Sequence, residues 1–264
     1  MSSSLAISLR VGRALMARNI YIILRSLYKP LIDGMFLVLT NCLVFGYLLP
    51  VIGMPERLIG PAFIGSLHTI LFNIAYGFAL RIVFDLKMKR FIDYQLNLPI
   101  SYVVLAGTYI LSWWFECIIT SAPIVFFGIF ILKSKIALAP LWIPFVILYL
   151  VSMLFLSLFF CTLALYYDYD WFHDNIWPRR LSPLLIAGCA FAPWHAIYTL
   201  NPFLGRLFLL NPVTYSIEGW RSSLLSRPEF INPWICIAVL TVTIVLLSGL
   251  FLFVFKKRLN PVDS

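Results

Sequence analysis

The chain has 264 residues, of which 62% are hydrophobic and only 12% are charged, and its mean hydropathy is +0.94. An ordinary soluble domain is about 45–50% apolar and about 25% charged. A soluble domain of this length could not cover so much apolar surface, which excludes soluble enzymes, secreted disulfide scaffolds and disordered chains. The net charge is +9. Because the basic residues flank apolar blocks, as in the cytoplasmic loops of membrane proteins, we expect a lipid bilayer and no nucleic acid as partner.

The five cysteines each lie inside or beside an apolar block, and the sequence has no C-x-x-C pair. An odd number of cysteines in such positions is typical of small packing residues, not of a disulfide framework or a zinc site. We therefore expect no metal. Arginines between residues 10 and 25 interrupt every early apolar run that could form the core of a signal peptide.

Charge-free windows predict six crossings of the bilayer, because about 20 apolar residues in a helix span its hydrocarbon core. The expected helices are 31–52, 58–80, 104–132, 141–166, 183–200 and 234–255. Pro193 interrupts the fifth of them, and a further apolar stretch is broken at Asn211 and Pro212. We interpret residues 203–226 as a re-entrant helical hairpin, with a surface loop as the alternative. The expected fold is a single all-α integral membrane domain over 1–264.

The distribution of lysine and arginine predicts that both termini lie in the cytoplasm. The side with the termini carries 14 of these residues and the other side 6, and cytoplasmic loops are the more basic ones. Residues 5–28 predict an N-terminal helix whose arginines share one arc. We expect this amphipathic helix to lie in the membrane interface until Pro30 turns the chain into the bilayer. A simple charged lead-in is the alternative.

No motif predicts catalysis. A P-loop of the form G-x-x-x-x-G-K-[ST] is missing, and so are G-x-S-x-G and H-E-x-x-H. The most acidic stretch, between the fourth and fifth crossings, contains Asp168, Asp170, His173 and Asp174. We interpret it as a structured cytoplasmic loop. The alternative is a membrane-embedded lipid- or glycan-modifying enzyme that uses these four residues.

Glu116 lies about twelve residues into the third crossing, near the bilayer midplane. An ionisable group is costly at that depth, and no basic residue is expected at a matching depth. We expect either a protonated, hydrogen-bonded carboxyl group or a role in a translocation path or subunit contact. The aromatic residues Tyr109, Trp113 and Trp114 on the same crossing either line a sugar or lipid path or face lipid or a partner subunit.

Residues 84–98, between the second and third crossings, mix charged and apolar residues at helical spacing. Such a pattern is typical of a short interfacial helix, and Pro99 marks its end. On the cytoplasmic face this helix would offer a docking site for another protein. The residues expected to form the site are Lys89, Arg90, Phe91, Tyr94, Leu96 and Pro99.

Two sequence blocks carry a resemblance to a known family. They are Leu96-Asn97-Leu98-Pro99-Ile100-Ser101 and Leu210-Asn211-Pro212-Val213-Thr214-Tyr215-Ser216-Ile217-Glu218-Gly219-Trp220-Arg221. Together with six crossings and an N-terminal interfacial helix, these blocks resemble the membrane subunit of ABC-2 type transporters. That family exports drugs, nodulation factors and polysaccharides, and the resemblance covers nearly the whole chain.

The resemblance implies a permease that moves an amphiphilic, glycan-linked or drug-like substrate across the bacterial inner membrane. Two copies would pair with two separate ABC ATPase subunits that bind the ATP, so this chain itself would be no enzyme and would hold no cofactor. Residues 84–98 would be the coupling helix that docks on the ATPase. The path or gate would include Glu116, Trp113, Tyr109, Asn211, Pro212, Tyr215, Glu218 and Arg221. A channel or secondary transporter would instead predict paired midplane charges or an inverted repeat, and the sequence indicates neither.

Overall fold

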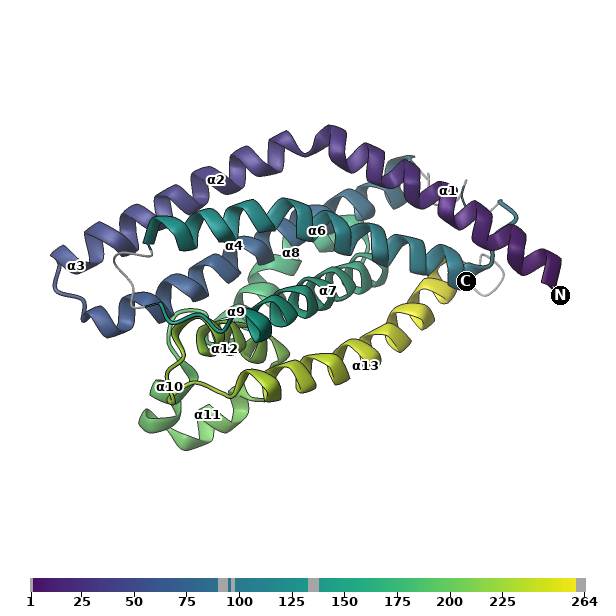
Figure 1. Cartoon of the computed structure of the whole chain (residues 1–264). Coiled ribbons are helices and arrows are strands. Elements are labelled where there is room, and N and C mark those ends of the chain that lie inside the picture. Colours follow the sequence, from purple (N-terminus) through teal and green to yellow (C-terminus); the bar gives the residue numbers. More distant parts are fainter. Residues whose placement is uncertain (1, 90–94, 96–97, 133–137, 260–264) are drawn as a thin grey trace.

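The structure, a computed structural model, describes residues 2–89, 95, 98–132 and 138–259. Within these residues every regular element is a helix, and five helices are long and apolar enough to cross a membrane. Figure 1 shows them as an elongated bundle in which the start of α1 and the end of α13 lie at the same end. The all-helical fold class is confirmed, and the long apolar helices are those of a multi-pass membrane protein.

The helices, in chain order, have the following bounds. They are α1 (Ser2–Ser26), α2 (Tyr28–Leu43), η1 (Val44–Leu48), α3 (Leu49–Val51), α4 (Glu56–Phe84), η2 (Asp85–Lys89), α6 (Tyr102–Leu132), α7 (Trp142–Tyr166), α8 (Tyr169–Ile176), η3 (Trp177–Leu181), α9 (Ser182–Ala187), α10 (Trp194–Leu200), α11 (Pro202–Phe208), α12 (Pro212–Leu225) and α13 (Pro233–Leu259). The η elements are π-helical turns, so α2, η1 and α3 form one crossing. Five of the six predicted crossings coincide with long helices, although the second continues past residue 80 to Met88.

The fifth predicted crossing, 183–200, is not one helix. α9 ends at Ala187, a turn follows, and α10 begins only at Trp194. Within that turn Cys189 has a φ of 62°, in the left-handed region, and Pro193 has no backbone N–H to donate. These two residues end the helix, so the described part of the chain has five continuous crossings and not the six expected.

A different stretch of the chain, just before the predicted fifth crossing, runs back along the bundle. α8, η3 and α9 form one helical run over 169–187. This run is antiparallel to α4. Near its start, Phe172 stacks on Tyr76 with ring centroids 5.7 Å apart, and just beyond its end, Ala190 approaches Gly65, which comes earlier in α4. The run contains two aspartates and two arginines. A search for charge-free windows therefore does not find it.

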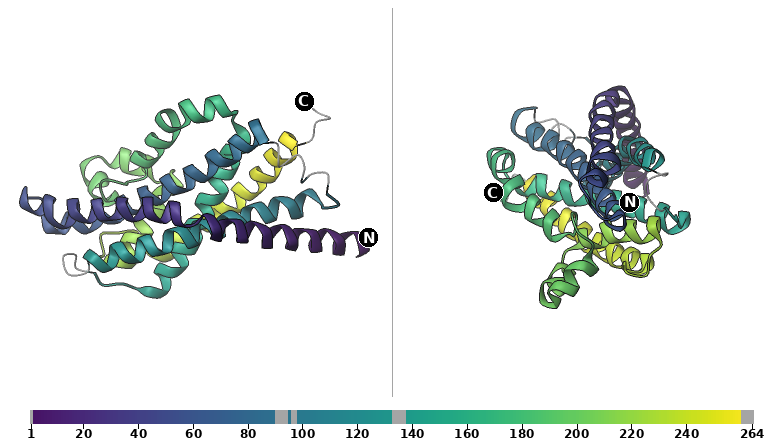
Figure 2. Two further views of the ribbon diagram at one scale, coloured as in Figure 1. Left: turned by 90° about the horizontal axis from the view of Figure 1, so that it is seen from above. Right: turned by 90° about the vertical axis from the view of Figure 1, so that its left-hand side faces the viewer.

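α1 and α2 form one bent rod that follows α6 along its length (Figure 2). Gly12 approaches Val104 near the start of α6, and Gly34 approaches Ile124 further along. The backbone between the two helices keeps helical dihedral angles. Pro30 lies in the first turn of α2, and the rod bends between the two helices but continues as a helix alongside α6.

The face of α1 that packs on α6 is small and polar. Ser8 and Gly12 are buried, and Asn19 Nδ2 donates a hydrogen bond of 3.2 Å to Ser112 Oγ. Large apolar side chains of α1, such as that of Leu24, stay exposed. A helix is thus present where the sequence predicts one, but it lies alongside α6 and leaves apolar surface available to lipid.

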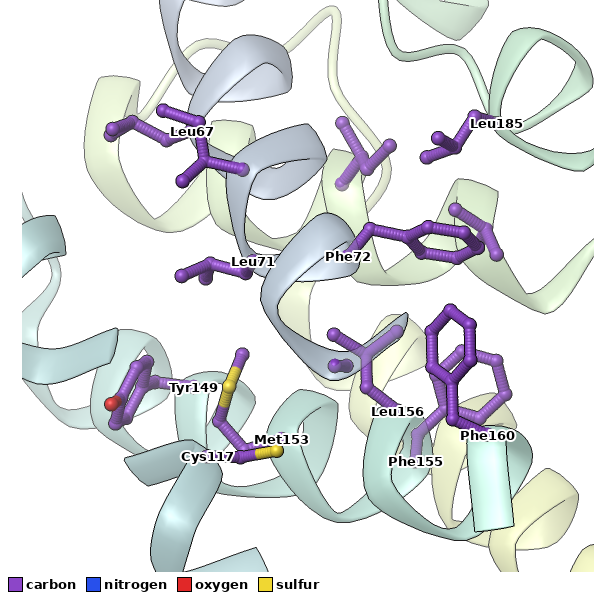
Figure 3. Packing of buried hydrophobic residues seen from close by; sticks show 14 of the residues in the cluster. Leu67, Leu71, Phe72, Cys117, Tyr149, Met153, Phe155, Leu156, Phe160 and Leu185 are labelled. Carbon is purple, nitrogen blue, oxygen red and sulfur yellow. The ribbon is translucent and has the colours of Figure 1, made fainter. Parts of the chain in front are cut away.

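The core centres on α4 and α7, the most buried crossings. In their most apolar windows 72% and 61% of the residues are buried, against 22% for the crossing that begins with α2 and 17% for α13. Figure 3 shows where α4 and α7 meet, and the rings of Phe72 and Phe160 there are T-shaped with centroids 4.8 Å apart. α2 and α13 are therefore the outer helices, which meet lipid or another subunit.

α12 is a short helix buried inside the bundle. Asn211 caps it by accepting a hydrogen bond of 3.0 Å from the Val213 N–H, and Pro212 takes the first helical position. Every residue from Val213 to Leu225 except Tyr215 is buried, and the helix contacts α4, α7 and α13. The Asn-Pro pair of the sequence is therefore a helix start.

Gly65→Ala should destabilise the fold. A Cβ at residue 65 would lie 1.8 Å from the Ala190 carbonyl oxygen, a backbone atom that cannot move without displacing the turn after α9. We expect a loss of about 1–3 kcal/mol, measured as a lower melting temperature of the detergent-purified chain. Gly77→Ala is the matched control, because this glycine of the same helix has nothing within 4 Å of a Cβ. Equal melting temperatures for the two variants would contradict the close packing of the turn on α4.

Candidate functional site

The eight residues predicted to form a path or gate fall into two separate groups. Tyr109, Trp113 and Glu116 of α6 line one cavity. The other five, which belong to α12 and its N-cap, are Asn211, Pro212, Tyr215, Glu218 and Arg221. The structure thus brings the first three together and places the others in a different part of the bundle.

The cavity, here called the polar cavity, lies between α1, α4 and α6. Its volume is about 260 Å³. Arg18 and Asn19 of α1, Arg81 of α4, and Trp113 and Glu116 of α6 contribute to its wall. Charged, amide and aromatic groups therefore meet in one hollow that is bounded by two crossings and the N-terminal helix.

Arg81 and Glu116 form an ion pair in this wall, in which the guanidinium Nη2 donates to the carboxylate Oε1. The Glu116 side chain is only 8% exposed, whereas that of Arg81 is 55% exposed. The expectation that no basic residue stands at the depth of Glu116 was wrong. α4 continues past the predicted end of its crossing, and the long arginine side chain then reaches α6.

Hydrogen bonds fix the other polar groups of the cavity wall. Arg18 Nη2 donates to Asn19 Oδ1 at 2.8 Å, and Asn19 in turn donates to Ser112. The Tyr109 hydroxyl donates to Gln95 Oε1 at 2.7 Å. In this wall, α1 is therefore joined to α6 by a hydrogen bond between polar side chains, which a polar ligand can replace.

The two adjacent tryptophans of α6 point to different surroundings. Trp113 lines the polar cavity. Trp114 instead donates from Nε1 to the Leu150 carbonyl oxygen of α7 at 3.0 Å. Trp113 therefore lies at a cavity wall and Trp114 packs against α7, while a role of either residue in a sugar or lipid path stays a prediction.

Arg221 and Glu218 form a second ion pair, which is fully buried. Both side chains are 0% exposed, and Arg221 Nη1 lies 2.7 Å from Glu218 Oε1. The guanidinium also donates to four backbone carbonyl oxygens, at 2.7 to 3.3 Å, those of Pro61, Cys189, Ala190 and Ala192. Glu218 Oε1 accepts in addition from the Trp194 N–H at 3.0 Å. The pair therefore anchors α12 to α4 and to the turn before α10, and its place in a path or gate stays a prediction.

Seven of the fifteen residues of the predicted coupling helix, 84–98, lie outside the described residues. That applies to four of its six expected docking residues, Arg90, Phe91, Tyr94 and Leu96. Lys89 ends η2, and Pro99 is exposed. Within the described part of this segment, Lys87 Nζ pairs with Asp170 Oδ1 at 2.6 Å, which joins η2 to α8.

The acidic stretch between α7 and α9 is divided among several ion pairs. The pairs are Asp168 with Arg258, Asp170 with Lys87, and Asp174 with His173. The carboxylates therefore do not converge on one point. In the described part of the chain, no group of three or more His, Cys, Asp or Glu residues could hold a metal ion. This arrangement adds no support for the enzyme alternative.

Sequence reasoning did not single out Arg18, Asn19 or Arg81 as site residues. The one available signal was the position of Arg81, which directly follows the charge-free window 58–80. Which residue of α6 it meets depends on how the helices pack, and that information is not in the hydropathy pattern.

No protein-family model, curated protein or solved structure matches this chain.

Arg221→Leu should destabilise the chain by about 3–5 kcal/mol, because it leaves the Glu218 carboxylate buried without its partner. The double variant Glu218→Leu/Arg221→Leu removes both charges and should recover part of that loss. Melting temperatures of the purified chains measure both effects. A double variant no more stable than the single one would show that the ion pair is not what holds α12 in place.

Proposed function

We propose that this chain is the membrane-spanning permease subunit of an ABC exporter, which moves an amphiphilic, glycan-linked or drug-like molecule across the bacterial inner membrane. The observation that carries the proposal is the polar cavity, whose wall contains the Arg81–Glu116 ion pair. Ionisable groups are costly inside a membrane and mark the pathways of substrates and ions. The sequence blocks that resemble ABC-2 type permeases give the proposal its mechanism.

The wall of the polar cavity suits an amphiphile. Ile22, Ile23 and Trp113 supply apolar contact, while Arg81 and Glu116 supply charge. Ligand sites generally combine a largely apolar wall with a few placed polar groups. A molecule with a polar head and an apolar body would find partners for both parts.

α1 is the element whose movement would widen this cavity. Polar contacts join it to α6, namely the Asn19–Ser112 hydrogen bond and a bond of 3.3 Å from the Ser101 N–H to Ser8 Oγ. Several of its large apolar side chains, such as those of Leu9 and Leu24, are exposed, so they contribute no burial that would oppose its displacement. In the proposed mechanism α1 is a gate whose open state becomes populated when the ATPase subunits bind nucleotide.

The energy for transport would come from a separate chain, because this sequence has no P-loop. Two ABC ATPase subunits would dock on residues 84–98 from the cytoplasm, where both termini are also proposed to lie. A second copy of this chain would complete the path. The outer helices α2 and α13 offer the apolar surfaces on which that copy would pack.

A secondary transporter or channel is the second candidate function. The observation that favours it is the Arg81–Glu116 pair itself, since ionisable groups within the membrane mark the ion and proton pathways of such proteins. The two candidates differ in their energy source: an exporter of the proposed type needs an ATPase, whereas a secondary transporter needs an ion gradient.

Affinity purification of the chain in nanodiscs from its native cell tests the proposal. Mass spectrometry would identify whatever co-purifies, and an ATPase assay would follow. We expect a stoichiometric P-loop ATPase with vanadate-sensitive turnover. A lone chain that moves solute in proteoliposomes under an ion gradient, without any ATPase, would overturn the proposal in favour of the secondary transporter.

Glu116→Gln should lower transport by about tenfold or more while the chain still folds, because it removes the charge that holds Arg81 at the cavity wall. A tenfold loss corresponds to about 1.4 kcal/mol. Substrate-stimulated ATPase activity of the purified complex measures the effect. Glu229→Gln is the control, because Glu229 also lies beside an arginine, Arg227 at 3.6 Å, but is 46% exposed and does not line the cavity. Wild-type transport by the Glu116→Gln variant would show that the ion pair of the polar cavity has no role in transport.

A further inference from the structure

A second hollow, here called the lateral groove, lies between α2 and α4 and has a volume of about 420 Å³. That volume is in the range of small-molecule sites, about 300–1,000 Å³. The lining residues that matter here are Lys29, Asp33 and Leu37 on one side and Ile74, Gly77 and Arg81 on the other. Arg81 also lines the polar cavity, so the two hollows meet at its side chain.

The groove opens to the outside of the bundle. Leu37 is 46% exposed, and Asn73, Gly77 and Arg81 form an exposed stripe along α4 at a spacing of four residues. A Cβ at residue 77 would meet nothing within 4 Å. Open space therefore runs along α4 to within one turn of Arg81, on a surface that faces the bilayer if α2 and α4 cross it.

Charge is concentrated at one end of the groove. α2 and α4 run in opposite directions, so Lys29 and Arg81 share one end, while Leu37 and Ile74 lie toward the other. The groove wall itself carries two basic groups, Lys29 and Arg81, and one acidic group, Asp33. Outside the groove, Glu116 pairs with Arg81, and Asp85 lines the polar cavity. The charged end is the one that the basic residues of the sequence assign to the cytoplasm.

The side chain of Arg81 is placed to bind a further anion. Its guanidinium lies over the Phe78 ring, 4.5 Å from the centroid, and in the described part of the chain its side-chain hydrogen bond goes to Glu116 through Nη2 alone. A guanidinium has five N–H donors and binds phosphate oxygens through two of them at once. More than half of the side chain is exposed, so a headgroup can reach it.

We propose that the lateral groove binds an anionic phospholipid of the membrane, with its phosphate between Lys29 and Arg81 and one acyl chain against Leu37 and Ile74. Charge complementarity selects this occupant, because basic pockets between membrane helices on the cytoplasmic side bind anionic headgroups. A zwitterionic lipid would bring its own cation to the two basic side chains. The inference rests on membrane embedding and on the geometry of the groove, not on the exporter function.

Native mass spectrometry of the full chain, released from detergent and titrated with lipid, tests this site. The probes are phosphatidylglycerol and phosphatidylcholine with identical acyl chains. We expect phosphatidylglycerol to bind about tenfold tighter or more, since each basic group near a headgroup contributes about fivefold. Equal affinities for the two lipids would overturn the proposal.

Two variants locate the bound lipid. Lys29→Gln should weaken phosphatidylglycerol binding about fivefold, and Gly77→Leu, which fills the groove without meeting another atom at its Cβ, should weaken it about tenfold or more. Gly249→Leu on α13 is the matched control, because this glycine is also exposed, with nothing within 4 Å of a Cβ, and should leave binding unchanged.

The pattern of effects separates the remaining possibilities. Wild-type affinity in Gly77→Leu together with a loss in Lys29→Gln would place the lipid on the basic surface of the N-terminal rod, and so overturn binding in the groove. Equal loss in Gly77→Leu and Gly249→Leu would show a general effect of added side chains and overturn it as well. Neither result bears on the ATPase partner, so the exporter proposal stands or falls separately.

Discussion

The rest of the structure depends on the fully buried guanidinium of Arg221. A charge removed from water must be neutralised, and its N–H groups must find acceptors. Glu218 supplies the neutralising charge, and backbone carbonyl groups of α4 and of the turn after α9 supply the acceptors. Because the helix stops after α9, carbonyl groups of the turn have no helical N–H partner and are free to accept from the guanidinium. The break after α9 and the buried position of α12 are therefore linked through Arg221.

The same network positions the polar cavity through α4. Pro61 has no N–H to donate to the Arg57 carbonyl oxygen one turn earlier, and Arg227 Nη1 donates to that oxygen instead, at 2.9 Å. The Pro61 carbonyl oxygen itself accepts a hydrogen bond from Arg221 Nε. The start of α4 is thus fixed by two arginines from the later part of the chain. Because a helix is rigid, fixing its start also fixes the place of Arg81 near its other end, opposite Glu116.

Much of the fold could be predicted because the thickness of the bilayer sets the length of the apolar segments that cross it. Apolar windows predicted the five long helices, and the break expected at Asn211 and Pro212 is the place where α12 begins. The helical run 169–187 was missed because its aspartates and arginines lie on exposed positions, while Phe172 and Ile176 are buried. The Arg81–Glu116 pair was missed because its members are separated by 35 residues and meet only through helix packing. The hydropathy pattern shows which segments form apolar helices, but not which helices pack against each other.

The central claim is that the polar cavity is a hydrated space within the bundle, which a transported molecule can enter. Cysteine labelling tests it directly, because a thiol reacts as the thiolate and cannot ionise in hydrocarbon. The five native cysteines are buried. We predict that a charged, water-soluble thiol reagent labels Trp113→Cys, at the cavity wall, at least about tenfold faster than Val245→Cys, which is 67% exposed on the outer helix α13. Equally slow labelling at the two positions would contradict the account.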